Sequence, residues 1–135
     1  MYIRILVADD HKIVREGLIA LLQQHASMQV VGEAENGRQA VQLAGELRPE
    51  VVIIDIGMPH LNGIEATRQI VAERPGIKVI ALSMHSDKRF VKGMLKAGAS
   101  GYLLKYCASE ELITAIHMVM AQRVYLSHDI TGFVV

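Results

Sequence analysis

Val51-Val52-Ile53-Ile54-Asp55-Ile56-Gly57-Met58-Pro59 is the stretch that decides how this chain folds. Its first four residues are branched and apolar without polar alternation, which is typical of a strand buried on both faces of a parallel sheet. Gly57 and Pro59 end that strand, because proline lacks the amide that a continuing ladder needs. Asp55 therefore lies where strand becomes loop. Ligands bind beyond the carboxyl ends of strands in open parallel sheets, so Asp55 is the candidate reactive group, although by itself it could equally cap a turn.

The composition indicates one ordinary domain without disulfides. The chain has 135 residues, and its 14 Lys and Arg balance 14 Asp and Glu, so no bulk positive field recruits nucleic acid. The single cysteine, Cys107, excludes an internal disulfide and a Cys-only zinc site, and it suits a reducing compartment. Charged residues interrupt every apolar run, and the first residues lack signal-peptide character. We therefore expect a cytoplasmic protein with no membrane contact and no DNA binding by this part alone.

Apolar runs and helical patterns alternate five times along the chain. The predicted strands cover residues 3–8, 28–33, 51–54, 78–83 and 102–104. The predicted helices begin near Lys12, Asn36–Gly37, Asn62, Asp87 and Ser109, and Asn62 and Asp87 are predicted as N-caps. Strict β-then-α alternation favours an α/β fold with a doubly wound parallel sheet and helices on both faces. We assign residues 1–122 to this domain and expect a loop-like tail over 123–135.

Two helices carry explicit predictions about which side chains face the core. In the first helix, helical spacing predicts an apolar face made by Ile13, Val14, Gly17, Leu18, Leu21 and Leu22. Arg15 falls on the opposite, polar face, together with Lys12, Glu16 and Gln23. In the last helix the predicted buried stripe comprises Leu112, Ile113, Ile116 and Met120.

Polar residues stand at the carboxyl ends of four different predicted strands and should converge on one edge of the sheet. They are Asp9-Asp10, Asp55, Ser83 and Lys105. Three neighbouring carboxylates repel one another unless a cation joins them, and an all-oxygen ligand set favours Mg²⁺. A carboxylate beside Mg²⁺ and an ammonium group is a suitable nucleophile for a phosphoryl group, which Ser83 could hydrogen-bond.

Each of these residues also has an ordinary structural explanation. Asp10 could cap the first helix, Ser83 could be a turn hydroxyl, and Lys105 could be a solvated residue at a strand end. These separate explanations do not account for polar residues at four strand ends at once, whereas a shared functional site does. His11 and His85 lie nearby in sequence, yet no histidine pair has the i, i+4 spacing of a helical metal site. We expect His11 to be an exposed loop residue.

Four motifs carry a family resemblance over residues 3 to about 122. They are Ala8-Asp9-Asp10-His11, Asp55-Ile56-Gly57-Met58-Pro59 followed by Asn62-Gly63, Ala81-Leu82-Ser83, and Gly98-Ala99-Ser100-Gly101-Tyr102-Leu103-Leu104-Lys105. With these motifs the chain resembles a response-regulator receiver domain of a two-component system, most closely the NarL/FixJ subfamily with LuxR-type output. The resemblance implies a flavodoxin-like (βα)₅ fold with strand order 2-1-3-4-5.

The resemblance also implies a role for each site residue. Asp55 would accept a phosphoryl group from a sensor histidine kinase, and Mg²⁺ would be held by Asp9, Asp10, Asp55 and the backbone carbonyl of Gly57. Lys105 and Ser83 would contact the phosphoryl group. Tyr102 would swing inward as Ser83 moves. The only reactions at Asp55 would be self-phosphorylation and autodephosphorylation, so we do not expect an enzyme acting on other substrates.

Two features depart from the wider family pattern. Tyr106 follows Lys105 where many receiver domains have proline, although NarL/FixJ-type members commonly lack that proline. Tyr125-Leu126-Ser127 resembles the start of a linker to a helix-turn-helix output domain, which is absent from these 135 residues. We therefore expect the chain to be part of a longer transcriptional regulator that contacts DNA only through the output domain. Homodimerisation on phosphorylation stays open.

Four other functions are alternatives to this one. A single-domain receiver would act by protein contacts alone. A Mg²⁺-dependent phosphohydrolase could use Asp55 as nucleophile, but such enzymes commonly need an acid two residues later, where this chain has Gly57. A flavin module is disfavoured because Asp9-Asp10 would repel the flavin phosphate. A degenerate receiver is disfavoured because the acceptor site is intact.

Overall fold

The chain folds around one parallel sheet with the strand order β2-β1-β3-β4-β5-β6. The structure is a computed structural model that describes residues 2–84 and 88–127. The elements are β1 (Ile3–Ala8), α1 (Lys12–Gln23), β2 (Met28–Ala34), α2 (Gly37–Leu47), β3 (Val51–Asp55), α3 (Gly63–Glu73), β4 (Lys78–Ser83), α4 (Lys88–Ala97), β5 (Gly101–Leu104), a 3₁₀ turn (Lys105–Cys107), α5 (Ala108–Met120) and β6 (Tyr125–Leu126). The predicted alternation and the order 2-1-3-4-5 are confirmed, and β6 is an addition to them.

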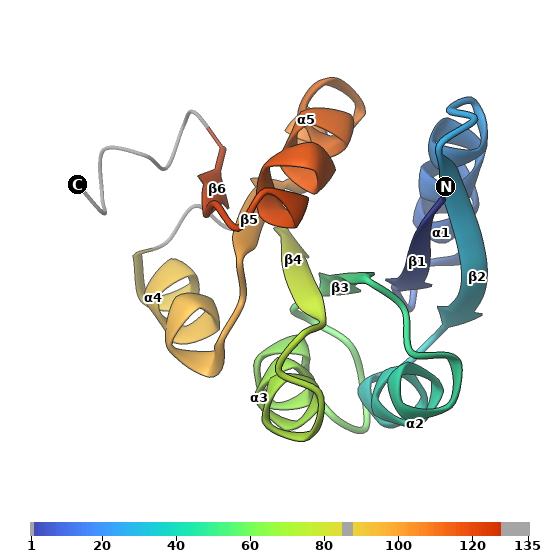
Figure 1. The fold of residues 1–135 in the computed structure, drawn as a ribbon. Helices are drawn as coiled ribbons and strands as arrows, with labels where there is room; N and C mark the ends of the chain where they lie inside the picture. Colours follow the sequence, from blue (N-terminus) through green and yellow to red (C-terminus); the bar gives the residue numbers. More distant parts are fainter. Residues whose placement is uncertain (1, 85–87, 128–135) are drawn as a thin grey trace.

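Helices cover both faces of the sheet, as predicted. Figure 1 shows α1 and α5 on one face and α2, α3 and α4 on the other. Each face has its own apolar core, one containing Leu18, Leu22 and Leu112 and the other Ala40 and Ile70. All five residues of β3 are buried, which confirms it as the central strand. The carboxyl end of β3 is therefore enclosed by the packed core on both faces of the sheet.

The loop after β3 is attached to the start of α3. The Asn62 side chain accepts a hydrogen bond from the Glu65 amide at 2.9 Å, so the predicted N-cap is confirmed. The Gly63 amide donates to the carbonyl oxygen of Ile56 at 2.8 Å. These bonds hold the residues that follow Asp55 in place. The predicted cap at Asp87 lies outside the described residues.

The predicted helix faces were wrong at several positions. Ile13 is 86% exposed, because it lies in the first turn of α1, beyond the end of β1, whereas Arg15 is buried with 9% exposure. In α5 the buried face also takes in Glu111, and Ile113 and Met120 are only partly buried. Arg15 and Glu111 are buried because each finds polar partners that periodicity cannot reveal.

The expected loop-like tail was wrong for Tyr125–Leu126, which forms β6 parallel to β5. The Ser127 amide donates to the Tyr102 carbonyl at 3.0 Å. The buried Glu111 carboxylate accepts hydrogen bonds from the Tyr125 hydroxyl at 2.6 Å and the Ser127 hydroxyl at 3.2 Å. Ser127 Oγ in turn accepts from the Leu104 amide at 3.1 Å. A two-residue strand has no sequence pattern, and its docking depends on Glu111 in another element.

Candidate functional site

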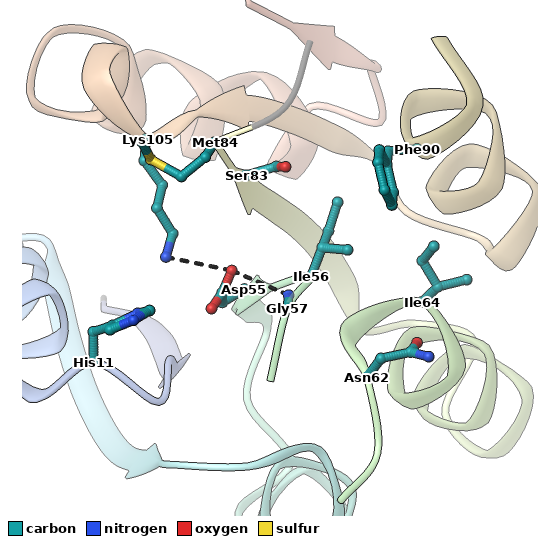
Figure 2. Close-up of a pocket in the computed structure, with 10 residues that line it drawn as sticks. All are labelled: His11, Asp55, Ile56, Gly57, Asn62, Ile64, Ser83, Met84, Phe90 and Lys105. Carbon is teal, nitrogen blue, oxygen red and sulfur yellow. Dashed lines mark hydrogen bonds and ion pairs between the residues drawn. The ribbon is translucent and has the colours of Figure 1, made fainter. Parts of the chain in front are cut away.

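The ends of β1, β3 and β5 bring two carboxylates and one ammonium group together. Lys105 Nζ lies 3.2 Å from Asp9 Oδ2 and 3.3 Å from Asp55 Oδ1. Figure 2 shows the Lys105 side chain pointing toward the Asp55 carboxylate, with a dashed line that marks the ion pair between them. The Lys105 side chain is only 11% exposed, and both acids are buried, so water screens these charges weakly. Lys105 is thus held between the two acids.

Asp55 sits in an environment that opposes its ionisation. Burial raises the pKa of the Asp55 carboxyl above its ordinary value, and the negative charge of Asp9 and the neighbouring Asp10 side chain raise it further. Lys105 and the Gly57 amide, which donates to Asp55 Oδ1 at 3.3 Å, lower the same pKa. An additional cation in the pocket would favour the ionised, nucleophilic carboxylate.

The loop between β1 and α1 supplies the remaining acidic groups. The His11 amide donates to Asp9 Oδ1 at 2.8 Å, and His11 Nδ1 lies 3.3 Å from both Asp9 Oδ1 and Asp10 Oδ1. The His11 side chain is 65% exposed, as predicted for a residue in an exposed loop. Its imidazole nevertheless contacts the acid pair, a contact that sequence reasoning missed.

The donor set fits a small divalent cation. One ligand atom from each of Asp9, Asp10, His11 and Asp55 lies within 4.8 Å of the others. Two buried oxygens, Asp9 Oδ2 and Asp10 Oδ1, have no aligned hydrogen-bond partner in the described part of the chain. The 3.2 Å approach of Lys105 to Asp9 Oδ2 is therefore a charge contact. Carboxylate oxygens left unsatisfied beside one another suit Mg²⁺, which prefers oxygen ligands and retains water.

A cavity of about 360 Å³ opens over Asp55. Its lining residues are His11, Asp55, Ile56, Gly57, Asn62, Ile64, Ser83, Met84, Phe90 and Lys105. Figure 2 shows Ile64 and Phe90 on the side of the cavity away from His11, so these two residues form an apolar wall there. Since one water occupies about 30 Å³ of liquid, there is room for a phosphoryl group and several waters.

The structure brings together most of the residues that the sequence singled out. Asp9, Asp55, Ser83 and Lys105 meet at one edge of the sheet, and Asp10 joins them through the adjoining loop. The apolar wall formed by Ile64 and Phe90 was missed, because nothing in the sequence distinguishes these two apolar helix residues from residues of the core.

Tyr102, the predicted switch residue, is completely buried in the core on the α2–α4 face of the sheet. Its side chain is therefore already inward in this structure. His85, the other residue considered near the site, lies outside the described residues.

The matching family model is the response regulator receiver domain, and it covers residues 5–117. The chain belongs to this family. As a receiver domain it is a signalling module, and receiver domains bind Mg²⁺ at their acidic pocket, which here corresponds to the Asp cluster. Among the described helices, none has the length and apolar character needed to span a bilayer.

Curated relatives of this receiver domain include a transcriptional regulatory protein and response regulators. It is 40% identical over 129 residues to the transcriptional regulatory protein DegU of Brevibacillus brevis, covering 96% of this chain and 55% of DegU. It is 42% identical to the response regulator GacA of Pseudomonas protegens, with 95% of this chain and 60% of GacA covered. The chain thus spans a little over half the length of these relatives.

Solved receiver domains share the architecture. The two-component response regulator of the LuxR family from Aurantimonas sp. SI85-9A1 matches with a TM-score of 0.94 and 36% identity, covering 99% of this chain and 96% of that one. The signal receiver domain of the putative response regulator NarL from Mycobacterium tuberculosis matches with a TM-score of 0.86 and 31% identity, covering 90% and 98% of the two chains. The flavodoxin-like receiver fold is therefore shown.

Proposed function

We propose that Asp55 is the phosphoacceptor of this receiver domain and that its phosphorylation switches a transcriptional regulator. The observation that carries the proposal is the buried Asp55 carboxylate, which lies 3.3 Å from Lys105 Nζ and faces a cavity beside two further carboxylates. A nucleophile with an adjoining cation and an acid cluster is suited to phosphoryl transfer, where the protein's main tasks are positioning and charge neutralisation.

The chain's own residues divide this task between them. One Asp55 oxygen attacks phosphorus, forming an acyl phosphate as the bond between phosphorus and the donor breaks. Lys105 moves from its contact with the two acids toward the new phosphoryl oxygens, and Ser83, which lines the same cavity, hydrogen-bonds one of them. Asp9, Asp10, Asp55 and the Gly57 carbonyl would hold Mg²⁺, which would supply positive charge to neutralise the phosphoryl oxygens.

The sensor histidine kinase that the family implies is the proposed physiological phosphoryl donor. The relatives are longer than this chain, so we propose that this receiver domain belongs to a regulator with a helix-turn-helix output domain that binds DNA. The switch would act in the cytoplasm. Apart from self-phosphorylation and autodephosphorylation at Asp55, no catalytic activity is proposed.

The direct test is incubation with Mg²⁺ and acetyl phosphate, followed by intact mass measurement and peptide mapping. We expect the mass of one phosphoryl group to appear on the peptide that contains Asp55, and only when Mg²⁺ is present. A protein that stays unmodified with saturating acetyl phosphate and Mg²⁺, or that is modified elsewhere, would show that Asp55 is not the acceptor.

Water access beside Gly57 is expected to shorten the lifetime of the phosphate. A Cβ atom added at Gly57 would meet no described atom within 4 Å, so the space there is open. Gly57→Met should slow autodephosphorylation about tenfold by obstructing the attacking water. A tenfold lower rate requires an activation free energy that is only about 1.4 kcal/mol higher. The Mg²⁺ contact is spared because it uses the backbone carbonyl.

This prediction is checked by following loss of phosphate after removal of acetyl phosphate, with Gly57→Ala as the smaller matched change. An unchanged rate in Gly57→Met would mean that water does not pass residue 57.

The phosphorylation state is proposed to be read at α4, β5 and α5, because Ser83 and Tyr102 lie on the strands that support this face. The docked β6 strand extends it, since Ser127 bonds both Tyr102 and Glu111. Glu111→Ala should release β6, because two hydroxyl groups lose their shared acceptor.

We expect amide exchange at Tyr125 and Ser127 to rise about fivefold or more, as loss of about 1 kcal/mol of hydrogen bonding predicts. Hydrogen exchange detected by mass spectrometry measures this effect. Glu110→Ala, at the neighbouring exposed position of α5, is the matched control and should leave exchange unchanged. Equal exchange in both variants would show that Glu111 does not hold the strand.

A further inference from the structure

A buried arginine lies behind the acid pocket, and the phosphorylation chemistry described above does not use it. The Arg15 side chain of α1 is only 11% exposed, the same fraction as that of Lys105 in the pocket. Its Nη1 donates to the backbone carbonyl oxygen of Asp9 at 2.7 Å, and its Nε donates to Glu33 Oε1 at 2.7 Å. The guanidinium thus connects the carboxyl end of β1 with β2.

Packing alone does not account for an arginine at this position. Burying a guanidinium costs desolvation energy, and its carboxylate partner Glu33 is 52% exposed, so the ion pair offsets that cost only in part. An apolar side chain of similar length would fill the space without the charge. What arginine adds is a rigid fork of donors, which can bind two acceptors in fixed directions.

The carbonyl that Arg15 binds belongs to a proposed metal ligand. Both carboxylate oxygens of Asp9 face the site: Oδ1 accepts a hydrogen bond from the His11 amide at 2.8 Å, and Oδ2 makes only a charge contact with Lys105 at 3.2 Å. The Asp9 carbonyl is the oxygen of the peptide group that joins Asp9 to Asp10. Fixing that oxygen holds the plane of the peptide and, with it, the positions of the Asp10 amide and Cα atom to which the Asp10 side chain is attached.

We propose that Arg15 is a positioning residue that orients the Asp9–Asp10 peptide for binding of a divalent cation. The proposal rests on the proposed function, because it concerns the cation that the acid pocket would hold. Groups behind metal ligands commonly fix ligand orientation, and their loss typically weakens metal binding by about 10- to 100-fold.

Arg15→Met tests the proposal, because methionine keeps an apolar stem but removes the donors. We expect the Mg²⁺ dissociation constant to rise about tenfold, the lower end of the range for such groups. Since the chain has no tryptophan, amide NMR titration is the suitable measurement. The His11 amide, which donates to Asp9 Oδ1, should shift in the folded, metal-free variant.

Phosphorylation by acetyl phosphate gives an independent readout. Arg15 touches neither the proposed nucleophile nor the cavity, so the rate at saturating Mg²⁺ should stay close to that of the parent while the Mg²⁺ concentration for half-maximal rate rises about tenfold. A variant that is merely less stable would not show the displaced His11 resonance. It would also not combine a higher Mg²⁺ concentration for half-maximal rate with an unchanged rate at saturating Mg²⁺.

Three further variants complete the experiment. Arg4→Met is the matched control, because Arg4 also donates to a backbone carbonyl, that of Arg48 at 2.9 Å, but at the opposite end of β1. It should leave Mg²⁺ affinity unchanged. Glu33→Gln keeps an acceptor for Nε and the contact with Asp9, so it should change affinity less than twofold. Arg15→Lys keeps the charge without the fork and should bind Mg²⁺ less tightly than the parent.

Each outcome either supports or contradicts the proposed positioning role of Arg15. Parent-like Mg²⁺ affinity in folded Arg15→Met would overturn the proposal, and so would a lower melting temperature with unchanged affinity and an unshifted His11 amide. If Arg15→Met does not fold, parent-like affinity in Arg15→Lys overturns it, and weaker binding supports it. A parent protein that neither binds Mg²⁺ nor accepts phosphate refutes the proposed function itself, whereas a working parent with an unaffected variant refutes only the role of Arg15.

Discussion

Asp55→Asn is expected to abolish phosphorylation while the fold stays intact. Asparagine has nearly the same shape as aspartate, but its amide is neither a nucleophile for phosphorus nor an anionic ligand for Mg²⁺. The strand end itself should not move, because the Gly57 amide can donate to the asparagine side-chain oxygen as it does to Asp55 Oδ1. Incorporation from acetyl phosphate should therefore fall below detection, the largest functional effect predicted for this chain.

The same substitution should make the metal-free protein more stable at neutral pH. Because the pKa of Asp55 is raised in the folded state, mainly by burial, ionised Asp55 destabilises the fold above that pKa. The penalty disappears as the pH falls through the folded pKa, where the carboxyl takes up a proton. Asp55→Asn should thus unfold at a higher temperature than the parent at pH 7, and this difference should shrink toward acid pH.

Mass spectrometry and thermal unfolding across a pH series check the two results together. Glu46→Gln is the control for loss of one acidic group, since Glu46 is exposed on α2 and accepts a hydrogen bond from the exposed Gln42 side chain at 3.0 Å. Labelling of Asp55→Asn at the parent's rate would assign the acceptor to another residue. A difference in unfolding temperature that does not depend on pH would mean that the charge of Asp55 is not what costs stability.

Sequence patterns predicted those parts of the molecule that depend on local periodicity and on strand ends. The uninterrupted apolar run before Asp55 and the cap at Asn62 were confirmed, because each depends on residues adjacent in sequence. The burial of Arg15 and Glu111 was not predictable in the same way. The acceptors of Arg15 lie 6 and 18 residues away, and Glu111 binds hydroxyl groups 14 and 16 residues away, so only the folded chain brings them together.

Gly63→Ala is expected to cause the largest combined loss of stability and phosphorylation. A Cβ atom at Gly63 would lie 2.3 Å from the carbonyl oxygen of Asp55 and 2.7 Å from Cα of Ile56. Both are backbone atoms, so no side chain can rotate away, and either α3 or the end of β3 has to shift. Overpacking of this kind costs about 1–3 kcal/mol and occasionally more, and we expect about 3 kcal/mol here.

The displaced atoms adjoin the proposed nucleophile. The rate of phosphorylation should therefore fall even in the fraction of the protein that stays folded. A misplacement of about 1 Å in reacting groups can cost about 10²-fold in rate, and we expect that loss in acetyl phosphate labelling of the folded variant.

Two glycine variants separate stability from geometry. Gly98→Ala should destabilise, because Gly98 has φ +109° and its added Cβ would lie 2.9 Å from a Val71 methyl group. Gly98 precedes β5, at the edge of the parallel sheet opposite to the end of β3, so this variant should keep the parent's labelling rate. Gly45→Ala, with no described atom within 4 Å, should stabilise α2 by about 0.5–1 kcal/mol. Parent-like labelling in Gly63→Ala would show that the close contact between α3 and Asp55 does not set the geometry of the site, whereas slow labelling in Gly63→Ala with normal labelling in Gly98→Ala would show that it does.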